Sequence, residues 1–462
     1  MNRTPPGPKG LLTMLRLARQ AGADPLGCFL DLARTYGDLI MLRLGPVRLC
    51  LVNHPDLVRE VLVHQTKSFR KPERLKRNLA KVVGNGLLTN EGDSWLRQRR
   101  LVQPAFHNRR MARYAEIVVE KTRIMMTDWP TANAIDIADA MTQLTLTIIA
   151  QALFDVDVAS QAPQLRSAVR VISGTLAREA RLPFSLPDWL PLPSKIRNRR
   201  AQRFVDQLIW NIILQRRATS EDRGDLLSML LLAVDGEGDS GGMTDQQARD
   251  EALTLFLAGH DSTAAGLTWT WYLTARHPAV EARLTEEIDA TLAGRPPTWD
   301  DLPRLAYTEA VIKESLRMYP PNWGTFPRQA VTDIELGGYV LPKGCQVLVS
   351  PYVLHHDPRS FSDPEQFDPE RFSPRRAESI PQFAYIPFGA GPRVCIGNTF
   401  AMMTMKLVVA AVLQQYRLVL APGQGDAEVE PLLVLRPKGG LNMTVNKRAT
   451  PATVGIPPGF TN

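Results

Sequence analysis

The chain has 462 residues, of which 44% are hydrophobic and 22% are charged; this is the composition of an ordinary soluble globular protein and excludes a fibrous or disordered chain. A chain of this size can bury a large core and still enclose a cavity. Its formal net charge of +8 favours an acidic partner, an anionic cofactor or nucleic acid, and charge alone does not choose among them.

The first elements along the chain are short. The opening MNRTPPGPKGLLTMLRLARQ has a brief apolar run that Arg16 and Arg19 interrupt, so neither a signal peptide nor a membrane span is expected. The runs DLIMLRLG and VRLCLVN flank Gly45-Pro46 and predict a β-hairpin. From Trp95 to about Leu230 apolar residues recur at helical spacing.

The clearest predicted helix begins at Thr244, which forms a capping box with Gln247, and runs to His277 before Pro278. It is apolar on most faces, so it is expected to cross the middle of the molecule. Asp261 lies near the middle of this helix, where charge in lipid is costly, and this argues against a membrane span.

The last third mixes short elements with loops. A helix is predicted over 307–318, and short strands follow it with Gly337-Gly338 as a turn. Residues 357–374 are rich in Pro, Asp and Ser and predict turns. A last long helix follows Cys395.

No internal repeat or linker interrupts this pattern. We therefore expect one mainly α-helical domain with small β-sheets over residues 1–462, with 1–20 and 448–462 loosely ordered. The four cysteines are scattered and form no C-x-x-C pair, which argues against a zinc site or c-type haem and fits a reducing cytoplasm.

The run PFGAGPRVCIG places Cys395 just before a helix. A helix N-terminus and the N–H groups of a glycine loop both favour a thiolate. The glycines leave room for a flat group, and Arg393 can face an anion beside it. These properties suit a thiolate ligand to haem iron, with the arginine at a propionate. A buried structural cysteine and a catalytic nucleophile are the alternatives.

Five motifs in the same order resemble the cytochrome P-450 family of haem-thiolate monooxygenases. They are the cysteine loop with Phe388, Gly391, Arg393, Cys395 and Gly397, the E-x-x-R pair Glu314 and Arg317, the segment Pro369–Phe372, the W-x-x-x-R pair Trp95 and Arg99, and AGHDS at Ala258–Ser262.

The resemblance implies the cytochrome P-450 fold, with haem b between the long central helix and the helix after the cysteine loop. Cys395 would be the iron ligand. The other expected haem-binding residues are Trp95, Arg99, Arg328, Arg393, Phe388, Gly389, Gly397 and Ala258. Glu314, Arg317 and Arg371 would form a buried structural network away from substrate.

The central helix would carry the oxygen chemistry. Gly259 is expected to weaken the helix locally beside the iron, and Asp261 with the next hydroxyl would relay protons. Ser262 stands where the family most often has threonine, and Thr263 follows it, so the identity of the relay hydroxyl stays open. His260 is expected to be a packed side chain.

The family comparison also outlines a mostly apolar substrate pocket. Its expected lining residues are Leu87, Leu88, Leu255, Phe256, Ala258, Asn322, Trp323, Thr325, Phe326 and Leu433. An apolar substrate follows, fatty-acid-, terpene- or polyketide-like. The segment GLLTNEGDSWLRQRRLVQPAF most resembles members that hydroxylate long chains.

Electrons are expected from a ferredoxin or flavodoxin with its reductase, docking on basic residues such as Arg97, Arg100, Arg109 and Arg110. O2 is the co-substrate. No nucleic acid and no membrane span are expected, and the location is cytoplasmic. A peroxide-driven peroxygenase is an alternative that Asp261-Ser262 disfavours, and a haem sensor or electron carrier is another.

Overall fold

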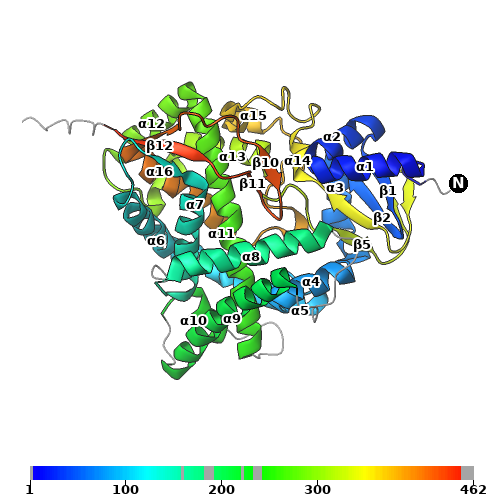
Figure 1. Cartoon of the computed structure of the whole chain (residues 1–462), viewed down its shortest axis with the longest axis horizontal. Helices are drawn as coiled ribbons and strands as arrows, with labels where there is room; N and C mark the ends of the chain where they lie inside the picture. Colours follow the sequence, from blue (N-terminus) through cyan, green and yellow to red (C-terminus); the bar gives the residue numbers. More distant parts are fainter. Residues whose placement is uncertain (1–3, 158–160, 182–191, 220–222, 233–241, 449–462) are drawn as a thin grey trace, which may run out of the picture.

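The computed structural model describes residues 4–157, 161–181, 192–219, 223–232 and 242–448. Most of them are helical (Figure 1). The helices are α1 Leu11–Ala23, α2 Pro25–Tyr36, α3 Pro55–Arg59, α4 Glu73–Val83, α5 Gly92–Val102, α6 Asn108–Thr127, α7 Ile137–Phe154, α8 Ala162–Arg181, α9 Pro193–Thr219, α10 Leu226–Leu232, α11 Asp245–Arg276, α12 Pro278–Leu292, α13 Ala306–Met318, α14 Pro351–His355, α15 Pro374–Ala377 and α16 Asn398–Gln415.

Four small sheets accompany the helices. The largest has the order β1-β2-β8-β5-β3, and the others are β4-β12-β9, β6-β7 and β10-β11. Their strands are β1 Leu39–Leu44, β2 Val47–Val52, β3 Phe69–Arg70, β4 Ala134–Asp136, β5 Arg328–Ala330, β6 Ile334–Leu336, β7 Tyr339–Leu341, β8 Gln346–Val349, β9 Tyr416–Leu420, β10 Val429–Pro431, β11 Leu435–Pro437 and β12 Asn442–Lys447.

The predicted β-hairpin is confirmed. Strands β1 and β2 pair antiparallel from Leu39 opposite Val52 to Leu44 opposite Val47, around the turn at Gly45. Strand β8 then adds to β2 in parallel. This sheet lies with α1 and α2 at one end of the molecule, on the right in Figure 1. Residues 1–20 were expected to be loosely ordered, but from Leu11 onward they belong to helix α1.

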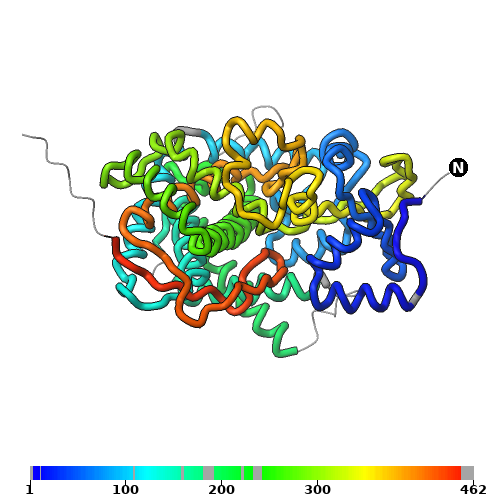
Figure 2. The backbone as a smooth tube through the Cα atoms, turned by 90° about the horizontal axis from the view of Figure 1, so that it is seen from above, coloured from blue at the N-terminus to red at the C-terminus, as the bar shows by residue number. Residues whose placement is uncertain are grey.

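The long central helix α11 also has the boundaries that the sequence predicts. Thr244 accepts a hydrogen bond from Gln247 N at 3.2 Å, and Gln247 Oε1 accepts one from Thr244 N at 3.0 Å. At the other end His277 caps the helix directly before Pro278. Figures 1 and 2 show α11 in green, running through the interior with the other helices around it.

Helix α7 packs along α11 and supplies much of the core. Among the described helices it alone is long and apolar enough to cross a membrane, and 61% of that stretch is buried inside the protein. Its buried face includes Leu144, Ile148 and Phe154. A core helix of a large protein has this composition because it is apolar on most sides.

A buried ion network joins α13 to the irregular segment that follows β8. Arg317 donates to Glu314 at 2.7 and 2.8 Å, and Arg371 donates to Glu314 at 3.3 Å. Glu314 and Arg317 are both 0% exposed. The network satisfies charges that would be costly to bury singly. Its three members lie together as the motifs imply.

The same network reaches the cysteine loop through His355. Arg317 donates to His355 O at 2.8 Å, and His355 Nε2 accepts from Ile386 N at 2.9 Å. Burial holds the pKa of His355 well below its usual value, so the ring stays neutral and keeps an acceptor nitrogen. Ile386 directly precedes Pro387, the first residue of the cysteine loop, so this hydrogen bond fixes the position of the backbone where the loop begins.

Replacing Glu314 tests the weight of this network. Glu314→Ala leaves two buried guanidinium groups without their carboxylate, so we expect the free energy of unfolding to fall by about 3–5 kcal/mol. Denaturant titration followed by tryptophan fluorescence measures the loss. The exposed pair Glu428–Lys438, at 2.7 Å, provides the control, and Glu428→Ala should leave the midpoint nearly unchanged. Equal shifts in the two variants would refute a special role for Glu314.

Candidate functional site

A cavity of about 140 Å³ lies between α11 and the cysteine loop. Helix α11 contributes Leu255, Ala258, Gly259, Ser262 and Thr263 to its wall. The loop and α16 contribute Pro387, Phe388, Cys395, Ile396, Gly397, Phe400, Ala401 and Met405.

Close backbone contacts shape the cysteine loop. Cys395 N donates to Phe388 O at 2.9 Å and closes the loop on itself. Gly391 has φ of 69°, and a Cβ there would lie 1.9 Å from Leu62 O, so only glycine fits. Gly389 lines a neighbouring groove beside α13 and α16 and is not among the residues of the cavity wall.

The Cys395 side chain faces the cavity. Burial raises the pKa of the Cys395 thiol, while the Gly397 N–H and Arg99 act in the opposite direction. The Gly397 N–H and the guanidinium of Arg99 thus favour the thiolate, as the loop pattern predicts, and desolvation of the thiol opposes them. A bound metal cation reverses this balance, since a coordinated thiol is deprotonated.

Cations gather beside the cavity around Trp95. The guanidinium of Arg393 lies 4.2 Å from the centre of the Trp95 ring, and that of Arg99 lies 5.8 Å from it. Arg99 also donates to Val394 O at 3.0 Å, which ties α5 to the cysteine loop. The predicted haem-binding residues Trp95, Arg99 and Arg393 thus meet in one place.

Lys71 belongs to the same cluster, and the sequence did not single it out. It is 4% exposed, and its Nζ donates to Asn90 O at 3.0 Å. Burial and the charge of Arg393 lower the pKa of Lys71 to about 7. Nothing in the run FRKPERLK distinguishes a buried lysine from its exposed basic neighbours.

The cluster has more positive than negative charge. Burial and repulsion by Arg328 lower the pKa of Arg393 to about 10, and burial lowers the pKa of Arg328. Glu91 acts in the opposite direction on both arginines and on Lys71. One carboxylate does not balance these buried cations, so the site fits a dianionic group. A thiol on the cavity wall and cations for two propionates are what haem b requires.

The two hydroxyls of α11 both line the cavity. Ser262 Oγ donates to Ala258 O at 3.2 Å, and Thr263 Oγ1 donates to Gly259 O at 2.9 Å. The helix continues unbroken through Gly259, contrary to the expected local weakening. Gly259 is needed for packing instead, because a Cβ there would lie 2.7 Å from Ile149 Cδ1 of α7.

Asp261 does not line the cavity. Its carboxylate accepts hydrogen bonds from Arg436 of β11 at 3.0 and 3.3 Å. His260 is buried, packs against the ring of Phe256 and hydrogen-bonds Phe256 O at 3.0 Å through Nδ1. His260 is therefore a packed side chain, as expected.

The expected pocket wall is only partly brought together. Leu255, Ala258 and Asn322 line the cavity. Phe256 is a core residue at 1% exposure, because it lies on the side of α11 that meets Phe154. The remaining expected residues are half-buried and lie away from this cavity's wall: Leu87, Leu88, Trp323, Thr325, Phe326 and Leu433.

Trp323 and Thr325 are occupied elsewhere. Trp323 Nε1 donates to Leu432 O at 2.9 Å, and Thr325 donates to Val349 O at 3.1 Å. The sequence missed several lining residues because they belong to distant apolar segments: Phe106, Ile149, Leu153, Leu316 and Pro321.

Two of the expected basic docking residues are hydrogen-bonded within the protein. Arg97 donates to Gly242 O at 3.2 Å, and Arg110 donates to Asp225 O at 3.3 Å. Arg100 is half-buried, and the side chain of Arg109 lies outside the described part of the chain. Arg97 and Arg110 thus join α5 and α6 to neighbouring segments, and their acceptors are neutral carbonyls that leave the positive charge in place.

Comparison with known proteins covers nearly the whole described chain. The cytochrome P-450 family model matches residues 5–444. Cyclooctatin synthase of Streptomyces melanosporofaciens is 41% identical over 397 residues, covering 86% of each chain. Pentalenene oxygenase of Streptomyces avermitilis is 35% identical over 405 residues, covering 87% of this chain and 88% of the relative. The crystal structure of the cytochrome P450DA haem domain has a TM-score of 0.88 at 28% identity, covering 97% of this chain and 98% of that one.

The titration of Lys71 provides a test of the cation cluster. With a pKa of about 7, part of Lys71 is neutral at neutral pH before an anion binds. Haem propionates favour the ammonium, so haem binding should take up protons near pH 7 and weaken as the pH rises above that value. Calorimetry of haem binding to the apoprotein in two buffers of different ionisation enthalpy measures the uptake. Lys71→Met should remove this contribution.

The exposed neighbour Lys67 gives the matched control for that experiment. Lys67→Met should leave proton uptake unchanged. Undiminished uptake in Lys71→Met would show that Lys71 does not meet the bound group.

Proposed function

The chain belongs to the cytochrome P-450 family, and from that premise we propose that Cys395 ligates the iron of haem b while Ser262 and Asp261 supply protons at the α11 side of the cavity. The protein is a haem-thiolate monooxygenase that inserts one atom of O2 into an apolar small molecule. One observation supports the residue roles: Cys395 and Ser262 line the same cavity, one from the loop and the other from α11.

Haem b, when bound, supplies the activation of O2 at its iron. The chain's own residues hold and orient the group. Arg99, Arg328 and Arg393 would pair with the propionates, and Lys71 would add a fourth cation beside them. The apolar side chains of Phe400 and Met405 from α16 exclude water from the cysteine side of the cavity.

Proton supply passes through Ser262 in this proposal. Its hydroxyl faces the cavity while its proton points back to Ala258 O, so it must turn to donate into the cavity. Asp261, on the adjacent side of α11, forms an ion pair with Arg436 of β11 at 3.0 Å and would pass protons to Ser262. Serine lacks the methyl group of threonine that restricts the rotamer, so this turn is less constrained.

The substrate class that we propose is a terpene-like hydrocarbon or alcohol. The names of cyclooctatin synthase, cyclooctat-9-en-7-ol 5-monooxygenase and pentalenene oxygenase support it. The cavity wall is mostly apolar, with Asn322 as a polar group that can orient a hydroxyl. A long-chain fatty acid is the rival substrate, because the segment around Trp95 resembles enzymes of that kind.

Monooxygenases of this family need a redox partner and O2. We assign the partner as a ferredoxin or flavodoxin with its reductase. We also propose that residues 1–462 form one catalytic domain and that the protein is located in the cytoplasm. Scattered cysteines and the buried position of α7 support that location.

A carbon monoxide difference spectrum of the reduced, haem-loaded protein tests the assignment of Cys395. Thiolate ligation should give a strongly red-shifted Soret band, and Cys395→Ser should lose it because a hydroxyl is a poor iron ligand. Cys28→Ala, which changes a buried cysteine of α2, should keep the band. An unchanged band in Cys395→Ser would overturn the assignment and with it the proposed function.

The role of Ser262 predicts a change in coupling. In Ser262→Ala, reducing equivalents should be diverted to hydrogen peroxide, and Ser262→Thr should restore product formation. Hydrogen peroxide and product are measured per NADPH with a surrogate ferredoxin system, once with pentalenene and once with a long-chain fatty acid. Diversion in Thr263→Ala with normal coupling in Ser262→Ala would move the role to Thr263. Turnover of the fatty acid alone would contradict the terpene-like substrate.

A further inference from the structure

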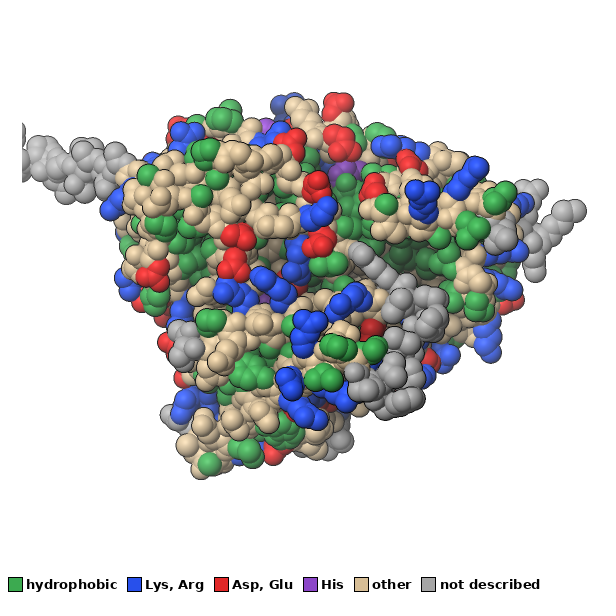
Figure 3. Space-filling view, in the orientation of Figure 1, with side chains coloured by type: hydrophobic (Ala, Val, Ile, Leu, Met, Phe, Trp, Pro, Cys, Tyr) green, Lys and Arg blue, Asp and Glu red, His purple; other side chains and the backbone are tan. Residues whose placement is uncertain are grey.

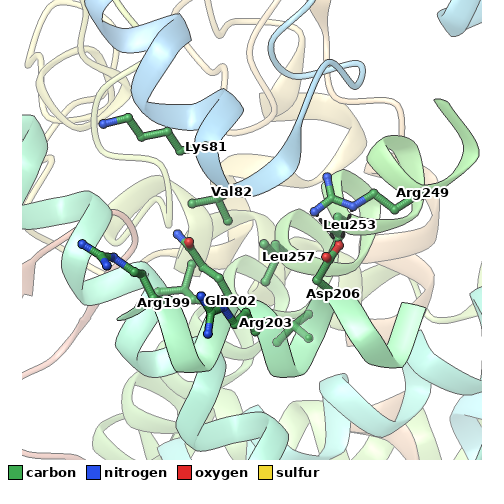
Figure 4. A pocket seen from close by; sticks show the side chains of 11 residues that line it. Lys81, Val82, Arg199, Gln202, Arg203, Asp206, Arg249, Leu253 and Leu257 are labelled. Atoms are coloured by element: carbon green, nitrogen blue, oxygen red, sulfur yellow. Dashed lines mark hydrogen bonds and ion pairs between the residues drawn. The ribbon is translucent and has the colours of Figure 1, made fainter. Parts of the chain in front are cut away.

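A second groove, separate from the haem cavity, lies where α4 and α8 approach α9 and α11. Its volume is about 310 Å³, and its lining shares no residue with the haem cavity. Figure 4 shows it between Lys81 and Val82 of α4 and Arg199, Gln202 and Arg203 of α9. A further hollow of about 180 Å³ adjoins it and shares Lys81, Val82, Arg199 and Gln202.

The groove meets α11 on the side away from the haem cavity. Its residues Arg249, Leu253 and Leu257 recur every four positions and form one stripe. At 100° per residue, Leu253 and Leu257 lie about half a turn from Leu255, which lines the haem cavity. A ligand in the groove therefore contacts the opposite face of the central helix.

The loop between α4 and α5 is fixed to α11. Asn85 N donates to Asp250 at 2.8 Å, and Leu87 N donates to Glu251 at 3.0 Å. A Cβ on Gly86 would lie 2.3 Å from Thr254 Oγ1, so the loop packs directly on α11. The loop therefore holds the end of α4, with its groove residues Lys81 and Val82, against α11.

The groove has an apolar floor and a rim of charged side chains. The floor is apolar and consists of Val82, Ile172, Val205, Leu253 and Leu257. The rim carries four cations: Lys81, Arg199, Arg203 and Arg249. The one lining carboxylate of the groove, Asp206, already accepts hydrogen bonds from Arg249 at 2.6 Å. Arg249 also contacts Asp250 at 2.7 Å, so its charge is offset, and Lys81, Arg199 and Arg203 supply the positive rim above the apolar floor.

The start of α9 strengthens this positive potential. It has five cations and no acidic residue between Pro193 and Arg203: Lys195, Arg197, Arg199, Arg200 and Arg203. Figure 3 shows Lys and Arg side chains gathering over α8 and α9 on this face. Clustered charge of one sign raises the local concentration of a counter-ion.

We propose that this groove binds an amphipathic anion, an apolar molecule that carries one phosphate or carboxylate group. Guanidinium groups of the rim donate paired hydrogen bonds to such an anion, and the apolar floor covers its body. The concave shape and a volume of about 310 Å³, at the lower end of the range of about 300–1,000 Å³ for ligand sites, fit a small molecule in preference to a protein surface. The site is independent of the proposed function, because none of its residues reaches the haem cavity.

Calorimetric titration of the haem-loaded protein with dodecyl phosphate, below its micelle concentration, tests the proposal. Arg199→Gln combined with Arg203→Gln removes two rim cations and should weaken binding by at least about tenfold. Arg197→Gln combined with Arg200→Gln is the matched control, because it removes the same charge from exposed positions of α9 outside the groove. This control should keep binding within about twofold of the unmodified protein.

Further ligands separate the sources of binding. Dodecanol and inorganic phosphate should each bind at least about tenfold more weakly than dodecyl phosphate, since each lacks one half of the recognised chemistry. Equal weakening in both arginine pairs, equal binding of dodecanol, or no binding at all would overturn the proposal. So would a Soret shift that follows the titration and persists in the groove variant, because the ligand would then occupy the haem cavity.

Vesicles of phosphatidylglycerol present the same phosphate chemistry from a bilayer. Binding to vesicles that depends on Arg199 and Arg203, together with binding of monomeric dodecyl phosphate, would identify the ligand as a lipid. Binding to vesicles without binding of the monomer would overturn the small-molecule site and favour a membrane-facing surface.

Discussion

Buried positive charge beside the cavity is the constraint on which the rest of the structure depends. Burial lowers the pKa of Lys71, Arg328 and Arg393, and repulsion by neighbouring cations further lowers the pKa of Lys71 and Arg393. Glu91 offsets only part of that charge. A dianionic group resolves the conflict, and because it binds the folded chain, it also stabilises the fold. Burial also raises the pKa of the Cys395 thiol, and a bound metal cation would offset this effect because it favours the thiolate.

The rigid position of the cysteine loop comes from elements outside the cavity. Glu314 and Arg317 hold the backbone at His355, and His355 in turn accepts the N–H of Ile386 directly before the loop. The loop then closes on itself through Cys395 N and Phe388 O. A thiolate ligand needs this precision, because a small displacement of its sulfur changes its bond to the metal.

Helix α11 connects the chemistry to the rest of the molecule. One face carries Ala258 and Ser262 toward the haem cavity, and the opposite face carries Leu253 and Leu257 into the cationic groove. Asp261 points to Arg436 on the C-terminal hairpin. A single helix therefore lines the apolar haem cavity with one face and the proposed anion-binding groove with the opposite face. It also carries the carboxylate that pairs with Arg436. Its tight packing on α7 through Gly259 keeps these faces in fixed relation.

The sequence by itself determined the features that depend on local spacing. The capping box at Thr244 and the proline after His277 determine both ends of α11. The glycine loop around Cys395 predicts a ligand site directly before a helix. Only the tertiary structure decided which side chains meet across distant segments. In the folded protein Lys71 lies in the cation cluster and Phe256 lies in the core. The groove lies between α4 and α9. Burial and net charge at such sites arise from packing between segments far apart in the chain, which local patterns do not contain.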